Sequence, residues 1–333
     1  MSTHKTRVVR FHETGSAEVL KLEEIELPLP QRGEVLINVK AIGLNRAEVA
    51  FRNGNYLERP ELPSGIGYEC SGTIEALGED VEGFKIGDKV STIPAFSMKS
   101  YGVYGEHALV PVQAVSHFPD RLSYEEATSI WMQYLTSYGA LVDYGKMNEN
   151  STVIITAASS SVGHASIEIA KALGATAIAT TRTQEKKQHL LDAGADHVIV
   201  TDDEDIQERV KQITNGKGAD LAFDPVAGSI VKDLAGSLAK GGKLIIYGKL
   251  SPEETPFPLF NLLKNGLTFK GYTLFELTMD PHRLKEARDW IYSALANAKL
   301  NPTIDTTFPL ENIVEAHKYM ESNQQKGKIV VTV

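Results

Sequence analysis

The sequence predicts an α/β protein with two domains, one a doubly wound parallel sheet and the other a partly open β-barrel. Its 333 residues are enough for two domains. Up to about residue 124, short β-branched runs alternate with Pro, Gly, Asn and Asp, and almost no helical period is present, as is typical of a barrel. Beyond Ser123, strand patterns alternate with helix patterns, which is the order of a doubly wound parallel sheet.

The barrel domain is predicted to comprise residues 1–124 and 299–333. One short helix is expected near Asn45, whose side chain can cap its first turn. The tail, residues 302–333, is β-like again, and its last strand is expected to return to this domain because a complete parallel sheet precedes it. The strand candidates before the tail are residues 8–11, 20–27, 35–41, 72–77, 89–93 and 105–110.

The parallel-sheet domain is predicted to comprise residues 125–298. Ser123 and Glu126 form a capping box that opens its first helix, and Pro281 opens a long last helix that ends near residue 298. The strand candidates between these helices are residues 152–156, 176–181, 196–201, 220–224, 243–248 and 268–272. The helices that alternate with them are predicted at residues 186–193, 204–214 and 229–239.

The sequence is organised around residues 151–182, where a strand, a turn of small residues, a helix and a second strand follow one another. Val162, Ile169 and Leu173 form an apolar stripe on the helix, and Gly174 ends it. This βαβ unit is the arrangement that places the pyrophosphate of a dinucleotide on a helix N-terminus.

The turn of this unit carries serines where the dinucleotide fingerprint usually has glycines. Only Gly163 remains, at the position that allows close packing of helix on sheet. Ser159, Ser160 and Ser161 keep the turn small, and their hydroxyls can donate hydrogen bonds to phosphate oxygens. A strand–turn–helix unit without any ligand is the alternative interpretation.

Composition and charge exclude several classes of protein. The formal net charge of −9 argues against nucleic acid or an acidic membrane as the main partner. The single cysteine, Cys70, excludes an internal disulfide and a cysteine-rich zinc site and is typical of a reducing cytosol. We recognise no signal-peptide pattern and no run near the roughly 20 apolar residues of a membrane span. We therefore expect a cytoplasmic protein that does not enter membranes.

Eight segments of the chain together carry a resemblance to a known family. They are residues 41–45, 52–56, 67–72, 83–90, 101–106, 151–182, 223–228 and 327–330. In this order they resemble the medium-chain dehydrogenase/reductase superfamily, and within it the zinc-free branch of quinone oxidoreductases and enoyl reductases. The resemblance implies a Rossmann-type sheet, a GroES-like barrel and an active site in the cleft between them. It also implies transfer of hydride to a quinone or an α,β-unsaturated carbonyl (an enone or enal).

The zinc ligands of the superfamily are missing from this sequence. Zinc members carry a cysteine where this chain has Asn45 and a histidine where it has Tyr68, and their third ligand falls near Met132 or Gln133. A catalytic zinc needs about three His, Cys or carboxylate ligands. The histidines show no ligand spacing, so His107 and His117 are expected to be ordinary surface or core residues. We therefore expect no metal.

Two other functions stay open. The first is a zinc-type alcohol dehydrogenase, which the missing ligands disfavour. The second is a nucleotide-binding protein whose role is mainly structural or regulatory, for which the serine-rich turn is the argument. Turnover with a reduced nicotinamide cofactor and a simple quinone separates an enzyme from such a binding protein.

NADPH is the expected cofactor. An NAD-type unit has an acidic residue about 20 residues after the glycine turn to bind the ribose 2′-hydroxyl. Here the second strand ends at Thr181, and Arg182 and Lys186 follow, so no carboxylate repels a 2′-phosphate; the alternative is that these are solvated surface charges. The residues assigned to the cofactor are Ser159, Ser160, Ser161, Val162, Gly163, Thr181, Arg182, Lys186, Tyr247, Gly248 and Lys328.

Three residues are assigned to catalysis through the resemblance. Tyr56 is similar to the tyrosine that enoyl reductases of this branch place beside the nicotinamide, where it can hydrogen-bond a developing oxyanion. Asn45 can support it with an amide donor, and Tyr68 occupies the position of a zinc ligand. The alternative is that Tyr56 packs the mouth of the cleft as a loop aromatic and that Asn45 only caps a helix.

A homodimer is also expected. Residues 268–275 form the last, apolar strand of the sheet, and an exposed edge of this kind is a liability unless it is paired or covered. Related reductases pair this strand across a two-fold axis. The alternative is that the chain covers the strand itself.

Overall fold

The computed structural model describes residues 3–333, and its chain divides into two compact units. Among the described residues, the first unit comprises residues 3–132 and 302–333, and the second comprises residues 133–301. The predicted boundaries at residues 124 and 298 precede these divisions by a few residues. One reason is that α2 (Tyr124–Ala127), which follows the predicted boundary, contacts β3 and β4 of the first unit.

The first unit is a barrel-like arrangement of strands, as the sequence predicts, and its strand pairs are antiparallel except β14 with β15. A seven-stranded sheet has the order β14-β15-β3-β4-β5-β7, with β6 also pairing with β3, and β1 and β2 form a separate pair. Its strands are β1 (Thr3–Arg10), β2 (Lys21–Pro28), β3 (Glu34–Gly43), β4 (Glu69–Leu77), β5 (Lys89–Thr92), β6 (His107–Pro111), β7 (Val115–His117), β14 (Ile304–Pro309) and β15 (Lys328–Thr332).

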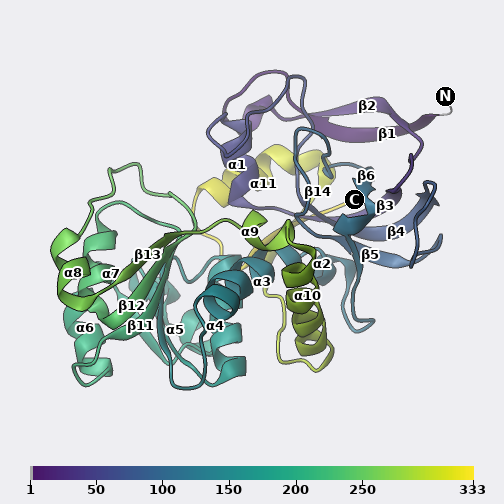
Figure 1. The fold of residues 1–333 in the computed structure, drawn as a ribbon. Helices are drawn as coiled ribbons and strands as arrows, with labels where there is room; N and C mark the ends of the chain where they lie inside the picture. The colour runs from purple at the N-terminus through teal and green to yellow at the C-terminus, as the bar shows by residue number, and fades with distance from the viewer. Residues whose placement is uncertain (1–2) are drawn as a thin grey trace. The chain divides into compact units, whose positions relative to one another are not determined.

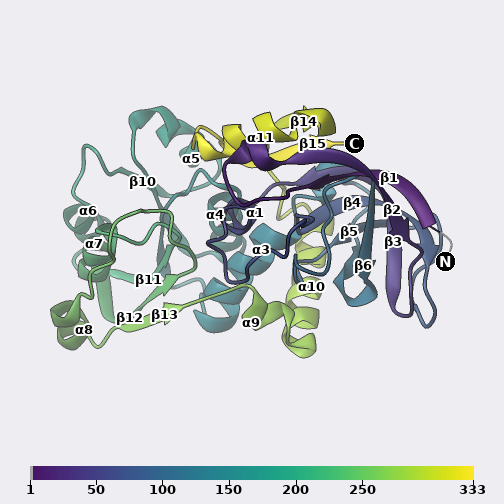
Figure 2. The same ribbon diagram turned by 90° about the horizontal axis from the view of Figure 1, so that it is seen from above.

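The C-terminal strand returns to this unit, which confirms the sequence prediction. β15 pairs antiparallel with β3, and Val330 lies opposite Gly43. Figures 1 and 2 show the yellow C-terminal segment beside the purple and blue strands of the N-terminal region. The register of β3 on β4 shifts twice, and such bulges bend a strand and increase its local twist, as closure of a barrel requires.

Two local predictions for the first unit need correction. The tail is not only β-like, because it contains α11 (Ile313–Glu321), whose buried residues Ile313, Ala316 and Met320 follow a helical period. Asn45 is the N-cap of α1 (Arg46–Arg52), but its side chain makes no capping hydrogen bond. By contrast, the capping box of Ser123 and Glu126 is present at the start of α2.

The second unit is a doubly wound parallel sheet, which confirms the predicted fold class. Six strands lie in the order β10-β9-β8-β11-β12-β13 and pair in parallel. They are β8 (Thr152–Ile155), β9 (Thr176–Thr181), β10 (His197–Val200), β11 (Ala219–Asp224), β12 (Leu238–Ile246) and β13 (Thr268–Gly271). The strand order reverses between β8 and β11, and ligands of such sheets bind at the carboxyl ends of the strands beside this point.

Helices cover both faces of this sheet. Figure 1 shows α6, α7 and α8 on one side of the labelled strands and α4 and α5 on the other. The helices of the unit are α3 (Trp131–Ser137, which begins in the first unit), α4 (Ser161–Leu173), α5 (Lys187–Asp192), α6 (Ile206–Ile213), α7 (Ile230–Ser237), α8 (Leu259–Asn265), α9 (Phe275–Thr278) and α10 (Pro281–Ala296). None of the helices in residues 3–333 is long and apolar enough to cross a membrane.

The central helix α4 is more deeply buried than its predicted stripe indicates. Ile169 is buried, but Val162 and Leu173 are only half-buried. His164 and Ile167 are buried instead, so the helix contacts its surroundings over more than one narrow face. Gly174 ends the helix with φ +78°, the left-handed conformation that favours glycine.

Candidate active site

The serine-rich turn joins β8 to α4 in the second unit. Ser160 is the N-cap of α4, and its side chain accepts a hydrogen bond from the Gly163 N–H over 3.1 Å. Ser159 and Ser161 on either side are half-buried. The helix is 13 residues long, so its N-terminus carries a partial positive charge that favours a bound anion. The turn can therefore hold a phosphate with hydroxyl donors in place of glycine backbone.

Gly163 allows the helix to begin this close to the turn. A Cβ at this position would lie 2.3 Å from the carbonyl oxygen of Ala158, which a larger residue could not tolerate without a shift of the helix. The preceding Ala157 has φ +46°, a conformation that glycine adopts more easily than alanine. The turn thus keeps the backbone path of a glycine-rich loop although only one of its glycines is present.

Two basic residues lie beyond β9, as the sequence predicts. The Lys186 ammonium donates a hydrogen bond to the Ser159 hydroxyl over 3.1 Å, so Lys186 lies against the turn. Arg182 follows Thr181, the last residue of β9, and is exposed. No ion pair of Arg182 is found among residues 3–333. A cation in contact with the turn and a second exposed cation at the end of β9 are both suited to a phosphate group.

The sequence did not single out Asp224, which links the two strands at the reversal of strand order. Asp224 ends β11, and the Thr156 hydroxyl after β8 donates to its Oδ1. The backbone N–H groups of Val226 and Ala227 also donate to this carboxylate, over 3.1 and 2.7 Å. Burial raises the pKa of Asp224, and the hydrogen bonds oppose that increase. These contacts fix the carboxyl ends of β8 and β11 beside the turn.

Tyr247 and Gly248 follow β12 at the same edge of the sheet. The Tyr247 ring stacks on Phe223 with 4.1 Å between centroids, and burial raises the pKa of its hydroxyl, which the Ser160 hydroxyl contacts. A Cβ on Gly248 would lie 3.0 Å from the Pro225 carbonyl oxygen. Both residues therefore lie where the loops after β11 and β12 approach each other closely.

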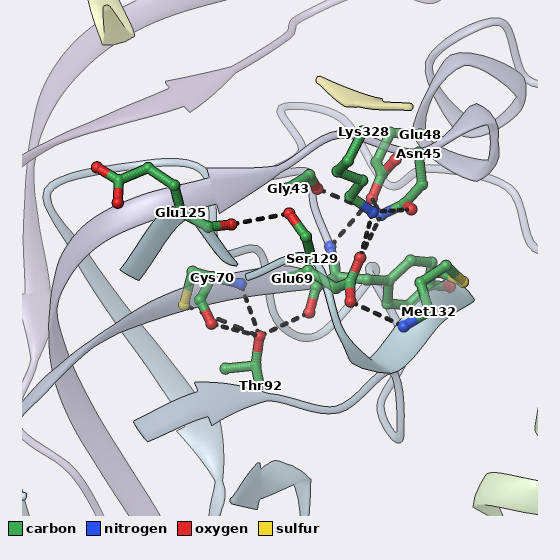
Figure 3. Close-up of polar contacts among 11 residues, drawn as sticks. Gly43, Asn45, Glu48, Glu69, Cys70, Thr92, Glu125, Ser129, Met132 and Lys328 are labelled. Carbon is green, nitrogen blue, oxygen red and sulfur yellow. Dashed lines mark hydrogen bonds and ion pairs between the residues drawn. The ribbon is translucent and has the colours of Figure 1, made fainter. Parts of the chain in front are cut away.

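A buried polar cluster lies in the first unit, where α1, β4 and β15 begin (Figure 3). Its side chains are those of Asn45, Glu48, Glu69 and Lys328, and each is at most 7% exposed. The Lys328 ammonium lies 2.6 Å from Asn45 Oδ1 and 2.5 Å from Glu69 Oε2. A Cβ on Gly43 would lie 2.8 Å from Lys328 Cε, so glycine there leaves room for the lysine side chain.

The cluster contains one cation and two carboxyl groups. Glu69 forms a salt bridge with the Lys328 ammonium and also accepts a hydrogen bond from the Met132 N–H over 2.7 Å. Glu48 Oε1 accepts from Asn45 Nδ2 and from the Tyr68 N–H, over 3.1 and 3.2 Å, but its Oε2 is buried without a hydrogen-bond partner. Burial raises the pKa of Glu48 to about 7, against the attraction of Lys328. The second carboxyl group is therefore about half protonated near pH 7 and mostly neutral below it.

A catalytic zinc ion does not fit this cluster. Asn45 and Tyr68 occupy the positions at which zinc-containing members of the superfamily carry ligands. The side-chain oxygen of Asn45 accepts from Lys328, and its amide group donates to Glu48 and Glu69. The Lys328 ammonium already occupies the space between Asn45 and Glu69, and a second cation beside it would be repelled. Glu69 alone supplies too few ligands for zinc.

The two predicted catalytic tyrosines lie next to each other. The ring centroids of Tyr56 and Tyr68 are 6.4 Å apart, and Tyr68 also packs on Phe96. Burial raises the pKa of Tyr56 to about 12, although a hydrogen bond with Tyr68 opposes this. The Tyr68 hydroxyl donates to Glu58 Oε1 over 3.4 Å. Tyr56 is therefore neutral and able to donate a hydrogen bond at physiological pH.

The structure separates the predicted cofactor residues into two groups. Ten of them lie at the carboxyl edge of the parallel sheet in the second unit, namely Ser159, Ser160, Ser161, Val162, Gly163, Thr181, Arg182, Lys186, Tyr247 and Gly248. Lys328 lies in the first unit, and its ammonium is bound to Asn45 and Glu69, so its assignment to the cofactor gains no support. Glu48 was not assigned to the site from the sequence. Its position three residues after the N-cap Asn45 is a recognisable signal that the two side chains lie close together.

A doubly wound sheet with an anion-binding turn, joined to a GroES-like barrel, defines a dehydrogenase of the medium-chain class. Residues 31–120 match the family of alcohol dehydrogenase GroES-like domains, and residues 161–293 match the family of zinc-binding dehydrogenases. A quinone oxidoreductase of Lama guanicoe is 32% identical over 328 residues, which cover 98% of this chain and 97% of the relative. The chain belongs to the quinone oxidoreductase branch of the medium-chain dehydrogenase/reductase family.

Solved structures agree with this membership. The Escherichia coli quinone oxidoreductase complexed with NADPH has a TM-score of 0.89 and 28% identity, with coverage of 98% of this chain and 100% of that one. A mycobacterial protein, also complexed with NADPH, gives the same TM-score of 0.89 at 28% identity, with the same coverage of 98% and 100%.

Proposed function

We propose that the protein is an NADPH-dependent oxidoreductase that reduces quinones or α,β-unsaturated carbonyls without a catalytic metal. The observation that carries the proposal is the turn before α4, with the Lys186 ammonium on Ser159 and Arg182 exposed beyond β9. The NADPH complexes of two structural relatives support the choice of cofactor. The single buried cysteine, Cys70, supports a location in the cytoplasm.

Two groups of residues bind the phosphates of the cofactor. Ser159, Ser160 and Ser161 hold the pyrophosphate at the start of α4, and Arg182 and Lys186 hold the 2′-phosphate. When bound, NADPH supplies the hydride. Orientation of the acceptor and stabilisation of its charge are left to the protein.

Tyr56 donates a hydrogen bond to the carbonyl oxygen of the acceptor as negative charge develops there. Its pKa of about 12 keeps the hydroxyl protonated, so Tyr56 hydrogen-bonds the enolate oxygen that an enone develops and assists its protonation, whereas a reduced quinone can take its protons from water. Tyr68 packs beside Tyr56 and its hydroxyl interacts with that of Tyr56, which orients the phenol. The Asn45–Lys328–Glu69 contacts hold the start of α1 and β4 rigid behind these rings.

Stopped-flow measurement of NADPH oxidation tests this function with three acceptors: 1,4-benzoquinone, a cyclic enone and an enal. We expect turnover with at least one of them and no change after dialysis against a chelator. Oxidation of alcohols that the chelator abolishes would instead identify a zinc-type dehydrogenase. Cofactor binding without turnover on any acceptor would identify a nucleotide-binding protein of structural or regulatory role.

The Tyr56→Phe variant should separate the two substrate classes. We expect kcat for an enone to fall on the order of 100-fold, the range of general acid–base catalysis. Quinone reduction should stay within a few-fold, because the product can take its protons from water. Tyr319→Phe is the matched control, since Tyr319 also loses a hydrogen bond, to Asp305, at a position outside the proposed site. Equal small losses of kcat on both substrates would show that Tyr56 only packs against its neighbours and takes no part in catalysis.

We also propose a homodimer formed through the edge of the parallel sheet. β13 is the last strand in the sheet order, and within residues 3–333 it pairs only with β12. In the segment that precedes β13, four apolar side chains are strongly exposed, namely Phe257 at 68%, Leu259 at 49%, Phe260 at 84% and Leu263 at 72%, and Phe257 packs on Phe269 of the strand. An exposed edge with an apolar surface next to it is suited to a second copy of the same chain.

Light scattering at micromolar concentration checks the dimer. We expect twice the chain mass of 36.4 kDa for the wild type and the single chain mass for Phe260→Asp. Ile86→Asp is the control, because Ile86 is 68% exposed in the other unit. A monomeric wild type would contradict the proposal.

A further inference from the structure

Two histidines and a glutamate from three different strands meet on the first unit, away from the buried cluster. His4 belongs to β1, Glu75 to β4 and His107 to β6. One potential ligand atom of each lies within 4.8 Å of the others, and these residues form the only such group of three or more among residues 3–333. His107 Nε2 is 3.0 Å from Glu75 Oε2, and His4 Nδ1 is 3.5 Å from Glu75 Oε1.

The fold brings these three side chains together through a bulge. The pairing of β3 with β4 shifts between Ile74 and Ala76, which leaves Glu75 unpaired in the ladder. A bulge of this kind redirects the side chain of its extra residue. On the other side of β3, His107 lies opposite Asn38, so β4 and β6 present Glu75 and His107 on either side of the same strand.

The first strand supplies the third group. β1 runs antiparallel to the segment that leads into β6, with a bridge between Val8 and Gly105. The Arg7 backbone oxygen accepts from the Glu106 N–H over 2.9 Å, which continues this pairing toward His107. The rings of His4 and His107 end 4.1 Å apart between centroids.

Neighbouring polar groups orient the cluster. The Thr6 hydroxyl lies 2.9 Å from His107 Nδ1, so it can accept from Nδ1–H and leave the lone pair on Nε2, on the side of Glu75. Asn38 Nδ2 donates to Glu75 Oε2 over 3.4 Å and lies 3.3 Å from His107 Nε2, so the amide shifts aside when an ion binds there. The contact of Thr6 with Nδ1 is the one that leaves Nε2 for a metal. Metal-binding histidines commonly have such a partner on the nitrogen that does not bind the metal.

We propose that His4, Glu75 and His107 bind a zinc ion that links β1 to β4 and β6. Two imidazoles, one carboxylate and one water are an established ligand set for zinc. In a tetrahedral site with bonds of about 2.0–2.2 Å, ligand atoms lie roughly 3.3 Å apart. His107 Nε2 and His4 Nδ1 lie 3.0 and 3.5 Å from different oxygens of Glu75, and one ligand atom of each residue lies within 4.8 Å of the others, so small side-chain shifts bring three ligands to this spacing. The side chains are 13–36% exposed, which leaves one side open to the water ligand.

This proposal departs from the sequence-based expectation of a chain without metal, but it does not restore a catalytic zinc. None of the three residues belongs to the proposed active site. The zinc would hold the N-terminal strand on the barrel, so its removal should lower thermal stability and leave turnover unchanged.

Zinc titration of the full chain, produced without a metal-binding tag and stripped with a chelator, tests the site. Calorimetry with zinc chloride should show one ion per chain, and cobalt in its place should give the visible absorption of a tetrahedral site. Tm should rise with zinc. His107→Gln and Glu75→Gln should each remove stoichiometric binding, and Thr6→Val should weaken it roughly 10-fold or more.

His117→Gln is the control, because His117 makes a similar contact with a carboxylate, that of Asp88, but has no third ligand near it. It should bind zinc as the wild type does. If His107→Gln fails to fold, His4→Gln on the N-terminal strand gives the same comparison. Absence of stoichiometric zinc binding, or binding that survives these substitutions, would overturn the proposal.

Discussion

The wild-type protein should lose stability relative to its Glu48→Gln variant as the pH rises from about 4.5 to about 7. Glu48 is fully buried, and its pKa is raised from 4.5 to about 7. In this window the folded chain keeps a proton that the unfolded chain releases, so the free energy of unfolding falls with pH. One pKa unit corresponds to about 1.4 kcal/mol, so the loss is about 3 kcal/mol and is complete above about pH 7.

Chemical denaturation at pH 5 and pH 8 measures this difference. Glutamine mimics the neutral carboxyl group, so the variant should be close to the wild type at pH 5 and clearly more stable at pH 8. Glu13→Gln is the control, because Glu13 is exposed and the same substitution there should give no pH-dependent difference. A stability gap that stays constant between the two pH values would show that Glu48 is ionised in the folded protein at both.

The Arg182→Glu variant should lose the preference for NADPH over NADH. Arg182 is exposed at the end of β9, and Lys186 contacts Ser159 of the turn, so both cations are available to a 2′-phosphate. A hydrogen bond to a charged group contributes about 1.5–3 kcal/mol, so two separate the cofactors by roughly 100-fold or more. Glutamate at position 182 removes one bond and repels the phosphate. The ratio of kcat/KM for the two cofactors measures the effect.

Lys211→Glu is the matched control for this change. Lys211 is exposed in the last turn of α6, in the same unit, and the substitution alters the charge by the same two units. Because helices run antiparallel to the strands in a βαβ unit, the end of α6 lies at the edge of the sheet opposite the turn. The control should keep the wild-type ratio. If Arg182→Glu also keeps it, Arg182 is a solvated surface charge.

The sequence by itself determined the fold class and most of the strands. Runs such as residues 176–181 coincide with β9 because β-branched residues favour extended backbone and the helix before them ends at Gly174. The roles of Gly163 and Gly174 were also predictable from the sequence, because each depends on nearby backbone. Gly163 leaves room for the carbonyl group of Ala158, and Gly174 adopts the left-handed conformation that ends the helix. α11 was missed because its apolar spacing lies in a tail whose flanking segments are strands.

Only the tertiary structure decided what the polar residues do. Lys328 and Glu69 are 259 positions apart in sequence, and β15 must return to β3 before they can pair. Once Lys328 neutralises Glu69, Glu48 is left as the surplus buried carboxyl group, and its pKa rises. His4, Glu75 and His107 have no ligand spacing in the sequence, because a bulge and two strand pairings bring them together. Local propensity follows neighbouring residues, whereas charge and ligand clusters depend on distances that exist only after the strands have paired.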